Sequence, residues 1–171
     1  MLAGEAVTWR EWAGGGLILT AALASKAENN DSIDSAIIDA LHEPNVLDGF
    51  DILAFKPFDP KGKRTEATVR DRNDHRFKVT KGAPQVIMDL VRLNPQMRRE
   101  VQTEIDDFAR KGQRTLGVAR TDEQDSQWQF LGILPLFDPP REDSAETIAQ
   151  AKTHGIDVKM VTGDNLSIAR E

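Results

Sequence analysis

Residues 50–84 of the chain, FDILAFKPFDPKGKRTEATVRDRNDHRFKVTKGAP, contain the pattern that decides its fold. Three segments have the composition of β-strands, namely Phe50–Phe58, Thr65–Val69 and His75–Thr80. Turn-forming residues separate them, at Asp59–Gly62 and at Asp71–Asp74. Because strands joined by short polar turns fold back on each other, the stretch predicts antiparallel pairing, with a β-hairpin across Asp71–Asp74.

Helical patterns precede this stretch. Leu17–Glu28 is rich in Ala and Leu, which favours a helix. Ser32–His42 carries apolar residues at helical spacing, with Asn30 or Asp31 as its N-cap and Pro44 as its end. The sequence therefore predicts two short helices before the first strand.

Further helices and strands follow it. The sequence predicts helices at Pro84–Arg92 and Pro95–Lys111, the second capped by Asn94 and closed by Gly112, and then strands at Thr115–Arg120 and Trp128–Leu134. The order is not the regular alternation of strand and helix that a parallel sheet requires. It indicates an α+β fold, a mostly antiparallel sheet with flanking helix pairs.

A second unit is predicted from residue 137 onward, because the prolines at 139 and 140 would stop any helix or strand that continued from the first unit. A helix is expected at Glu142–His154, closed by Gly155, and a short apolar strand at Ile156–Val161. Helix, strand and polar loop in this order are typical of a parallel α/β unit. We therefore expect two domains, 1–136 and an incomplete α/β fragment at 137–171.

The composition excludes several functions. The 171 residues carry a net charge of −6 and are 39% hydrophobic, so a packed core is expected but a nucleic-acid-binding surface is not. No cysteine is present, which rules out disulfides and thiolate metal sites, and the three histidines lack metal-ligand spacing. The apolar runs are too short to span a bilayer, and Glu5, Arg10 and Glu11 interrupt any signal peptide. A soluble chain is expected.

Several candidate binding residues lie at predicted strand ends and turns. Lys81-Gly82-Ala83-Pro84 joins a strand to a helix N-terminus, a corner suited to an anion. Phe58, with Lys63 nearby, could stack a base and meet its phosphates, and Arg114 follows a helix stop. Each also has an ordinary interpretation: a solvated lysine in a turn, a core phenylalanine or a surface cation.

The sequence Thr162-Gly163-Asp164 ends the last predicted strand. A hydroxyl, a flexible backbone and a carboxylate at that place suit phosphate and magnesium chemistry, although three residues are not specific. Neither the GxxxxGK[ST] nor the GxGxxG pattern occurs in the chain. The two commonest sequence routes to a nucleotide site are therefore closed.

Taken in order, the motifs resemble those of the P-type ATPases over nearly all of the chain beyond about residue 20. They are FKPFDP at 55–60 with KRT at 63–65, KGAP at 81–84, GQRTL at 112–116, DPPR at 138–141 and KMVTGD at 159–164. The stretch LPLFDPPR at 134–141, followed by DSAETI at 143–148, is most similar to the plasma-membrane proton pumps. The resemblance implies the nucleotide-binding domain of such a pump and the start of its returning phosphorylation domain.

The resemblance also implies roles for individual residues. Phe58 would stack on adenine, Asp34 would lie near the adenine amino group, and Lys63 would lie close by. Lys81 would line the pocket, Gly82 would allow close approach, and Arg114 would reach the phosphates. Asp138 and Arg141 would form the hinge, and Thr162, Gly163 and Asp164 would form the loop that contacts phosphate and nucleotide.

The resemblance further implies ATP or ADP as ligand, Mg²⁺ in the parent pump, and a place on the cytoplasmic face of the plasma membrane. The partners would be the parent's phosphorylation, actuator and transmembrane domains. The phosphorylated aspartate of the family lies in a DKTGT segment, which this chain lacks, so the chain should bind nucleotide without turnover. Proton as the transported ion rests on the closer resemblance alone.

Two other functions stay open on the residues. A haloacid-dehalogenase-type phosphatase would fit Thr162–Asp164, but it requires an Asp-x-Asp near an N-terminal strand, which is missing. A stand-alone adenine-nucleotide sensor would need no pump.

Under the pump hypothesis, the neighbours of the strand Ile156–Val161 lie outside this chain. That segment should then not form a covered strand here, nor should Asp164 face Lys81.

Overall fold

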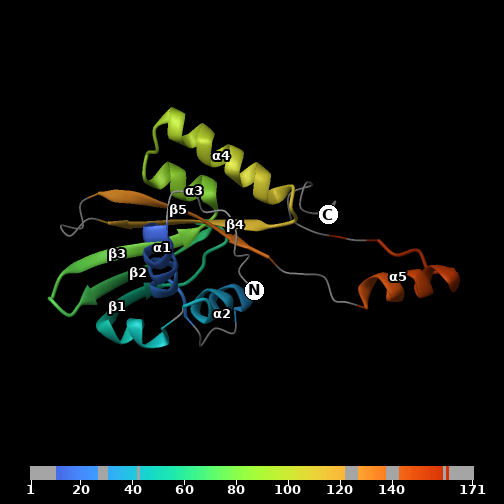
Figure 1. Ribbon diagram of the computed structural model, residues 1–171, viewed down its shortest axis with the longest axis horizontal. Coiled ribbons are helices and arrows are strands. Elements are labelled where there is room, and N and C mark those ends of the chain that lie inside the picture. Colours follow the sequence, from blue (N-terminus) through green and yellow to red (C-terminus); the bar gives the residue numbers. More distant parts are fainter. Residues whose placement is uncertain are drawn as a thin grey trace.

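The computed structural model describes residues 11–26, 31–41, 43–121, 127–137, 143–159 and 161. Along the chain the elements are α1 (Glu11–Leu23), α2 (Ser32–Asp39), the 3₁₀ helix η2 (Pro44–Gly49), β1 (Phe50–Lys56), β2 (Arg64–Asp71), β3 (Arg76–Gly82), α3 (Pro84–Leu90), α4 (Pro95–Ala109), β4 (Arg114–Thr121), β5 (Trp128–Leu136) and α5 (Ser144–Thr153). Figure 1 shows their arrangement.

The strands form one antiparallel sheet in which spatial order equals chain order, β1-β2-β3-β4-β5. The predicted hairpin is confirmed: β2 and β3 pair from Arg64 opposite Gly82 to Arg70 opposite Arg76. Its turn is held by the Asp71 carboxylate, which accepts hydrogen bonds from the N–H groups of Asn73 and His75. The α+β class predicted from the order of elements is therefore confirmed.

Helices cover both faces of the sheet. On one face α1 packs over β3, β4 and β5 and also contacts α2; its apolar clusters include Ala21, Val79 and Val118, each fully buried. On the other face α3 and α4 cover the β4–β5 half of the sheet, around Met88 and Ile133. Because successive side chains of a strand point to opposite faces of the sheet, the same strands contribute apolar residues to the cores on both faces.

The predicted N-caps are confirmed, whereas each of the first four helices ends before its predicted end; α3 ends at Leu90, not Arg92, and α4 at Ala109, not Lys111. Asp31 caps α2 by accepting a hydrogen bond from the N–H of Ile33, and Asn94 caps α4 through Met97. The first helix begins earlier than predicted and ends at Leu23, not Glu28. It ends there because the chain turns toward the sheet, where the carbonyl of Ala24 accepts a hydrogen bond from the Thr65 hydroxyl.

Another boundary error concerns the end of α2 and the segment after it. That helix ends at Asp39, before the predicted end at His42, which lies outside the described residues. Pro44 does not simply stop a helix: it begins the 3₁₀ turn η2. Proline suits the first turn of a helix because its missing N–H would have no intrahelical partner there.

The C-terminal helix forms as predicted, but the strand after it does not. α5 has no buried residue and lies apart from the sheet in Figure 1. Residues 156–159 are not a strand, and Ile156 and Val158 are exposed. A strand needs a neighbour for its backbone hydrogen bonds, and no described strand lies beside this segment. Met160 and Thr162–Asp164 lie outside the described residues, so the expected place of Asp164 is not tested.

None of the described helices combines the length and the apolar character that crossing a membrane demands.

Candidate functional site

A pocket of about 560 Å³ opens where β1 and β2 meet the end of β3. It brings together residues that are distant in sequence. Its lining includes every described residue predicted to contact a ligand, namely Asp34, Phe58, Lys63, Lys81, Gly82 and Arg114. Asp138, Arg141, Thr162, Gly163 and Asp164 lie outside the described residues.

The floor of the pocket holds a buried ion pair. Lys81 Nζ lies 2.5 Å from Asp34 Oδ1, and the two side chains are only 5% and 6% exposed. The second carboxylate oxygen, Asp34 Oδ2, accepts a hydrogen bond of 2.8 Å from the backbone N–H of Lys26. The pair connects α2 to β3 and places a donor beside an acceptor at the bottom of the pocket.

This pairing corrects the interpretation of Lys81-Gly82-Ala83-Pro84 as an open anion corner. The Lys81 ammonium is engaged by Asp34, and the Ala83 N–H donates a hydrogen bond of 2.9 Å to the carbonyl of Lys63. α3 contains only seven residues, so its N-terminal dipole is short. A ligand at this corner would therefore meet a lysine that is already paired with Asp34 and a glycine that is packed against the backbone of Lys63.

Gly82 is required by the chain's own backbone. A Cβ at this position would lie 2.3 Å from the carbonyl oxygen of Lys63 and 2.6 Å from Arg64 Cα. Such distances are far inside van der Waals contact, so a larger residue would push β2 and β3 apart. The resemblance implies that Gly82 lets a ligand come close. In the structure it is the backbone of Lys63 that comes close to Gly82.

The rim of the pocket carries an exposed aromatic ring. Phe58 is 57% exposed, so the alternative interpretation of a core phenylalanine is wrong. The loop after it is held by Asp59, whose carboxylate accepts from Gly62 N–H at 2.8 Å and whose carbonyl accepts from Lys63 N–H at 2.6 Å. Lys63 itself has a positive φ of 49°, which this tight loop imposes. The loop that follows Phe58 is therefore held by its own hydrogen bonds.

Sequence reasoning missed several lining residues. Asp31, Ile33, Phe55, Thr65 and Leu116 also face the pocket. Phe55 lies within the same motif as Phe58 and could have been included. Thr65 ends the KRT motif at 63–65 but was given no role from the sequence. Its buried hydroxyl donates a hydrogen bond of 2.8 Å to the carbonyl of Ala24, which ties β2 to the end of α1.

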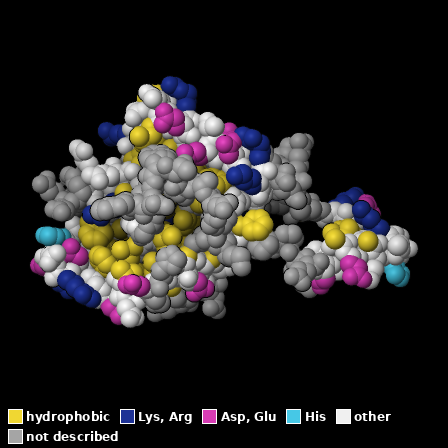
Figure 2. Space-filling view, viewed as in Figure 1, with side chains coloured by type: hydrophobic (Ala, Val, Ile, Leu, Met, Phe, Trp, Pro, Cys, Tyr) yellow, Lys and Arg dark blue, Asp and Glu magenta, His cyan; other side chains and the backbone are white. Residues whose placement is uncertain are grey.

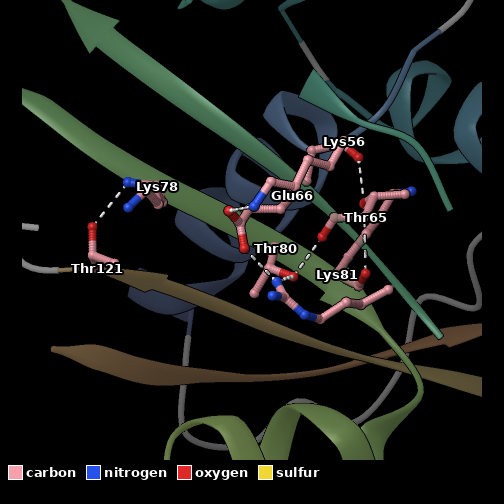
Figure 3. A network of polar contacts seen from close by, with 9 residues as sticks. Lys56, Thr65, Glu66, Lys78, Thr80, Lys81 and Thr121 are labelled. Atoms are coloured by element: carbon pink, nitrogen blue, oxygen red, sulfur yellow. Dashed lines mark hydrogen bonds and ion pairs between the residues drawn. The ribbon is translucent and has the colours of Figure 1, made fainter. Parts of the chain in front are cut away.

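Behind the pocket, on the opposite face of the sheet, lies a polar cluster around Glu66 (Figure 3). Glu66 forms ion pairs with Arg64 at 2.6 Å and with Lys56 at 3.0 Å, and Arg64 also donates to the hydroxyl of Thr80. Burial acts to raise the pKa of the Glu66 carboxyl, but the hydrogen bonds and charges of Arg64 and Lys56 outweigh it and lower that pKa. The cluster stabilises the start of β2, which carries Thr65 into the pocket.

No group of three or more His, Cys, Asp or Glu side chains that could hold a metal ion occurs within the described ranges. The paired Asp34 is also a poor metal ligand, because a neighbouring ammonium already satisfies it. The described residues therefore do not fit a resident Mg²⁺.

The antiparallel sheet, its flanking helices and this pocket form an α+β domain with a cavity of ligand size. A family described as P-type ATPase, cytoplasmic domain N, matches residues 17–143. Since the match covers most of the chain, the chain belongs to this family. It is 42% identical over 173 residues to the protein named "Putative cation-transporting ATPase MJ1226" from Methanocaldococcus jannaschii. That alignment covers 99% of this chain and 21% of the relative, so the chain spans about a fifth of its length.

Proposed function

We propose that the chain binds ATP and ADP in this pocket and serves as the nucleotide domain of a cation pump. The observation that carries the proposal is the exposed ring of Phe58 on the rim of a pocket whose floor is the buried Lys81–Asp34 pair. The volume of about 560 Å³ falls within the range of small-molecule sites. Family membership supports a nucleotide as the ligand.

The arrangement suggests how the nucleotide would lie. The adenine would stack on Phe58 and reach inward, where the Lys81–Asp34 pair offers it a donor and an acceptor. The phosphates would lie toward Lys63 and Arg114, whose side chains are exposed on the pocket lining. With one stacking ring and no phosphate loop, the site should bind weakly, with a Kd of roughly 0.1–5 mM.

The parent pump would couple ATP hydrolysis to cation export through an aspartyl-phosphate, with the proton as the proposed ion. Residues 1–136 would form the nucleotide domain, and residues 137–171 would begin the returning phosphorylation domain. The name of the relative supports a cation pump over a phosphatase or a stand-alone sensor. The phosphorylation, actuator and transmembrane domains would be the partners, and Asp138, Arg141, Thr162, Gly163 and Asp164 would act in the hinge and the phosphate loop.

An NMR titration of the ¹⁵N-labelled chain with ATP, ADP and AMP tests the proposal. Amide shifts are expected around Phe58, Lys63, Lys81 and Arg114, with a shared Kd for each nucleotide. Phe58→Ala should weaken binding by about 1–3 kcal/mol, since stacking on an aromatic ring has that value elsewhere.

Phe137→Ala is the matched control, because Phe137 is also an exposed phenylalanine but does not line the pocket. Its affinity for ATP should equal that of the unmodified chain. An absence of shifts at these positions with about 10 mM nucleotide, twice the weakest expected Kd, would refute the proposed function. Equal losses of affinity in both phenylalanine variants would remove Phe58 from the site.

A further inference from the structure

The outer edge of β1 is a surface that the pocket does not explain. β1 ends the sheet, and within the described part of the chain no strand pairs with its outer side. Its burial pattern is mostly exposed. An uncovered edge of this kind presents backbone N–H and C=O groups to any further strand.

Apolar side chains gather at the same place. Ile52 and Leu53 of β1 are 45% and 43% exposed, and Val46 of the neighbouring η2 is 37% exposed. On the face shown in Figure 2, hydrophobic side chains gather over the region where Figure 1 draws α1 and the strands β1, β2 and β3. Exposed apolar residues that adjoin one another, rather than occurring singly, mark a surface for association.

A β-bulge in β1 brings its two charged side chains, Asp51 and Lys56, to the same face of the sheet. Asp51 pairs with Arg70 across the sheet, and Lys56 pairs with Glu66, so both charged residues lie on one face. They can do so only because the register shifts between Ile52 and Ala54, which leaves Leu53 as an extra residue. In a regular strand, residues 51 and 56 would point to opposite faces.

The same bulge places Ile52 and Phe55 together on the other face, opposite Val69 and Ala67. Counted outward from Ala54, with the extra residue Leu53 left out, each half of β1 thus carries an apolar residue, Ile52 or Phe55, and then a charged one, Asp51 or Lys56. The two charges have opposite sign, and their side chains are exposed.

We propose that β1 is a self-association surface, on which two copies of the chain pair antiparallel about a two-fold axis at Ala54, beside the bulge. In this register Asp51 faces the partner's Lys56, and Ile52 faces the partner's Phe55. The occupant is a second copy because the charge pattern is complementary to itself under that rotation. Backbone pairing along the edge extends the sheet across both copies. The contact requires no nucleotide, so it is independent of the proposed function.

Sedimentation equilibrium of the whole chain, without nucleotide, tests the proposal. Because one strand per copy buries little area, a weak dimer is expected, with a Kd on the order of 0.1 mM. Asp51→Lys alone and Lys56→Asp alone each place like charges at both ends of the contact. Each should weaken the dimer at least about tenfold. An equimolar mixture of the two variants should recover the dimer, because both cross-pairs regain opposite charges.

Further variants control for loss of folding and for non-specific association. The double variant Asp51→Lys/Lys56→Asp should dimerise like the unmodified chain, and thermal melts should show that every variant is folded. Leu53→Lys should abolish the dimer, whereas Ile148→Lys, which replaces a residue 41% exposed on α5, should not. A monomer at about 1 mM, a dimer that survives Leu53→Lys, or a mixture that fails to recover would overturn the proposal.

Discussion

The antiparallel sheet and the C-terminal segment differ in the burial of their apolar residues. Val69 and Val79 of the sheet are fully buried, while Val158 is 42% exposed and Val161 is 95% exposed. The strands of the sheet have neighbours from the same chain, whereas residues 156–159 have none among the described residues. The difference indicates that a helix such as α5 forms from its own hydrogen bonds, but a strand depends on what lies beside it.

The largest expected effect contrasts a lysine in each region. Lys81→Ala leaves the Asp34 carboxylate buried without its cation, which should cost about 3–5 kcal/mol of unfolding free energy. Lys159→Ala removes an ion pair of 3.5 Å with Asp157 in which both side chains are 80% exposed, and should change stability by less than about 0.5 kcal/mol. Urea denaturation compares the two.

If Lys81 only lined the pocket, Lys81→Ala would weaken nucleotide binding without unfolding the domain. A double variant, Asp34→Asn with Lys81→Met, separates the two effects because it removes both buried charges together. It should recover part of the stability lost in Lys81→Ala. Equal stability of the Lys81 and Lys159 variants would show that the buried pair contributes nothing.

A second contrast uses two glycines. Gly82→Ala should destabilise the sheet by roughly 1–3 kcal/mol or more, because the new methyl would overlap the backbone of Lys63. Gly155→Ala meets no atom within 4 Å and is opposed only by its φ of 74°, so about 1 kcal/mol or less is expected, confined to the end of α5. Amide hydrogen exchange locates each effect.

A third contrast concerns pH. Since the folded-state pKa of Glu66 is lowered below its usual 4.5, its contribution to stability is present above that value and is lost as the pH falls through the folded-state pKa. For Asp71, burial acts to raise the pKa of the carboxyl, but the hydrogen bonds from His75 and Asn73 together outweigh it and lower that pKa, so its contribution to stability has the same sign.

Glu66→Gln should therefore reduce the loss of stability measured by thermal melts between about pH 5 and pH 3. The part of that loss due to Asp71 should remain. An unchanged acid profile in Glu66→Gln would show that the ion pairs with Arg64 and Lys56 are not formed in solution.

The smallest expected effect is the absence of turnover. With no DKTGT segment, the chain should form no acid-stable acyl-phosphate with magnesium-ATP and release no phosphate above background. Radiolabelled ATP followed by acid precipitation measures this directly. A phosphorylated aspartate in either region would contradict the proposed division between binding in this chain and chemistry elsewhere in the pump.

The sequence by itself determined the features that depend on short-range interactions. The hairpin from Arg64 to Gly82, the N-caps Asp31 and Asn94, and the helix α5 follow from residues within a few positions of one another. Motif order was also sufficient to select Phe58 and Lys81, because a linear pattern is all that a resemblance needs.

Only the tertiary structure decided which of these residues meet. The pair Lys81–Asp34 joins residues 47 positions apart, and no local propensity encodes that contact. Burial then changed the role of Lys81 from a free cation to a paired one, and it imposed glycine at 82 through the backbone of Lys63. The missing strand at 156–159 has the same physical cause: backbone pairing across a sheet is a long-range interaction, which an apolar pattern permits but cannot supply.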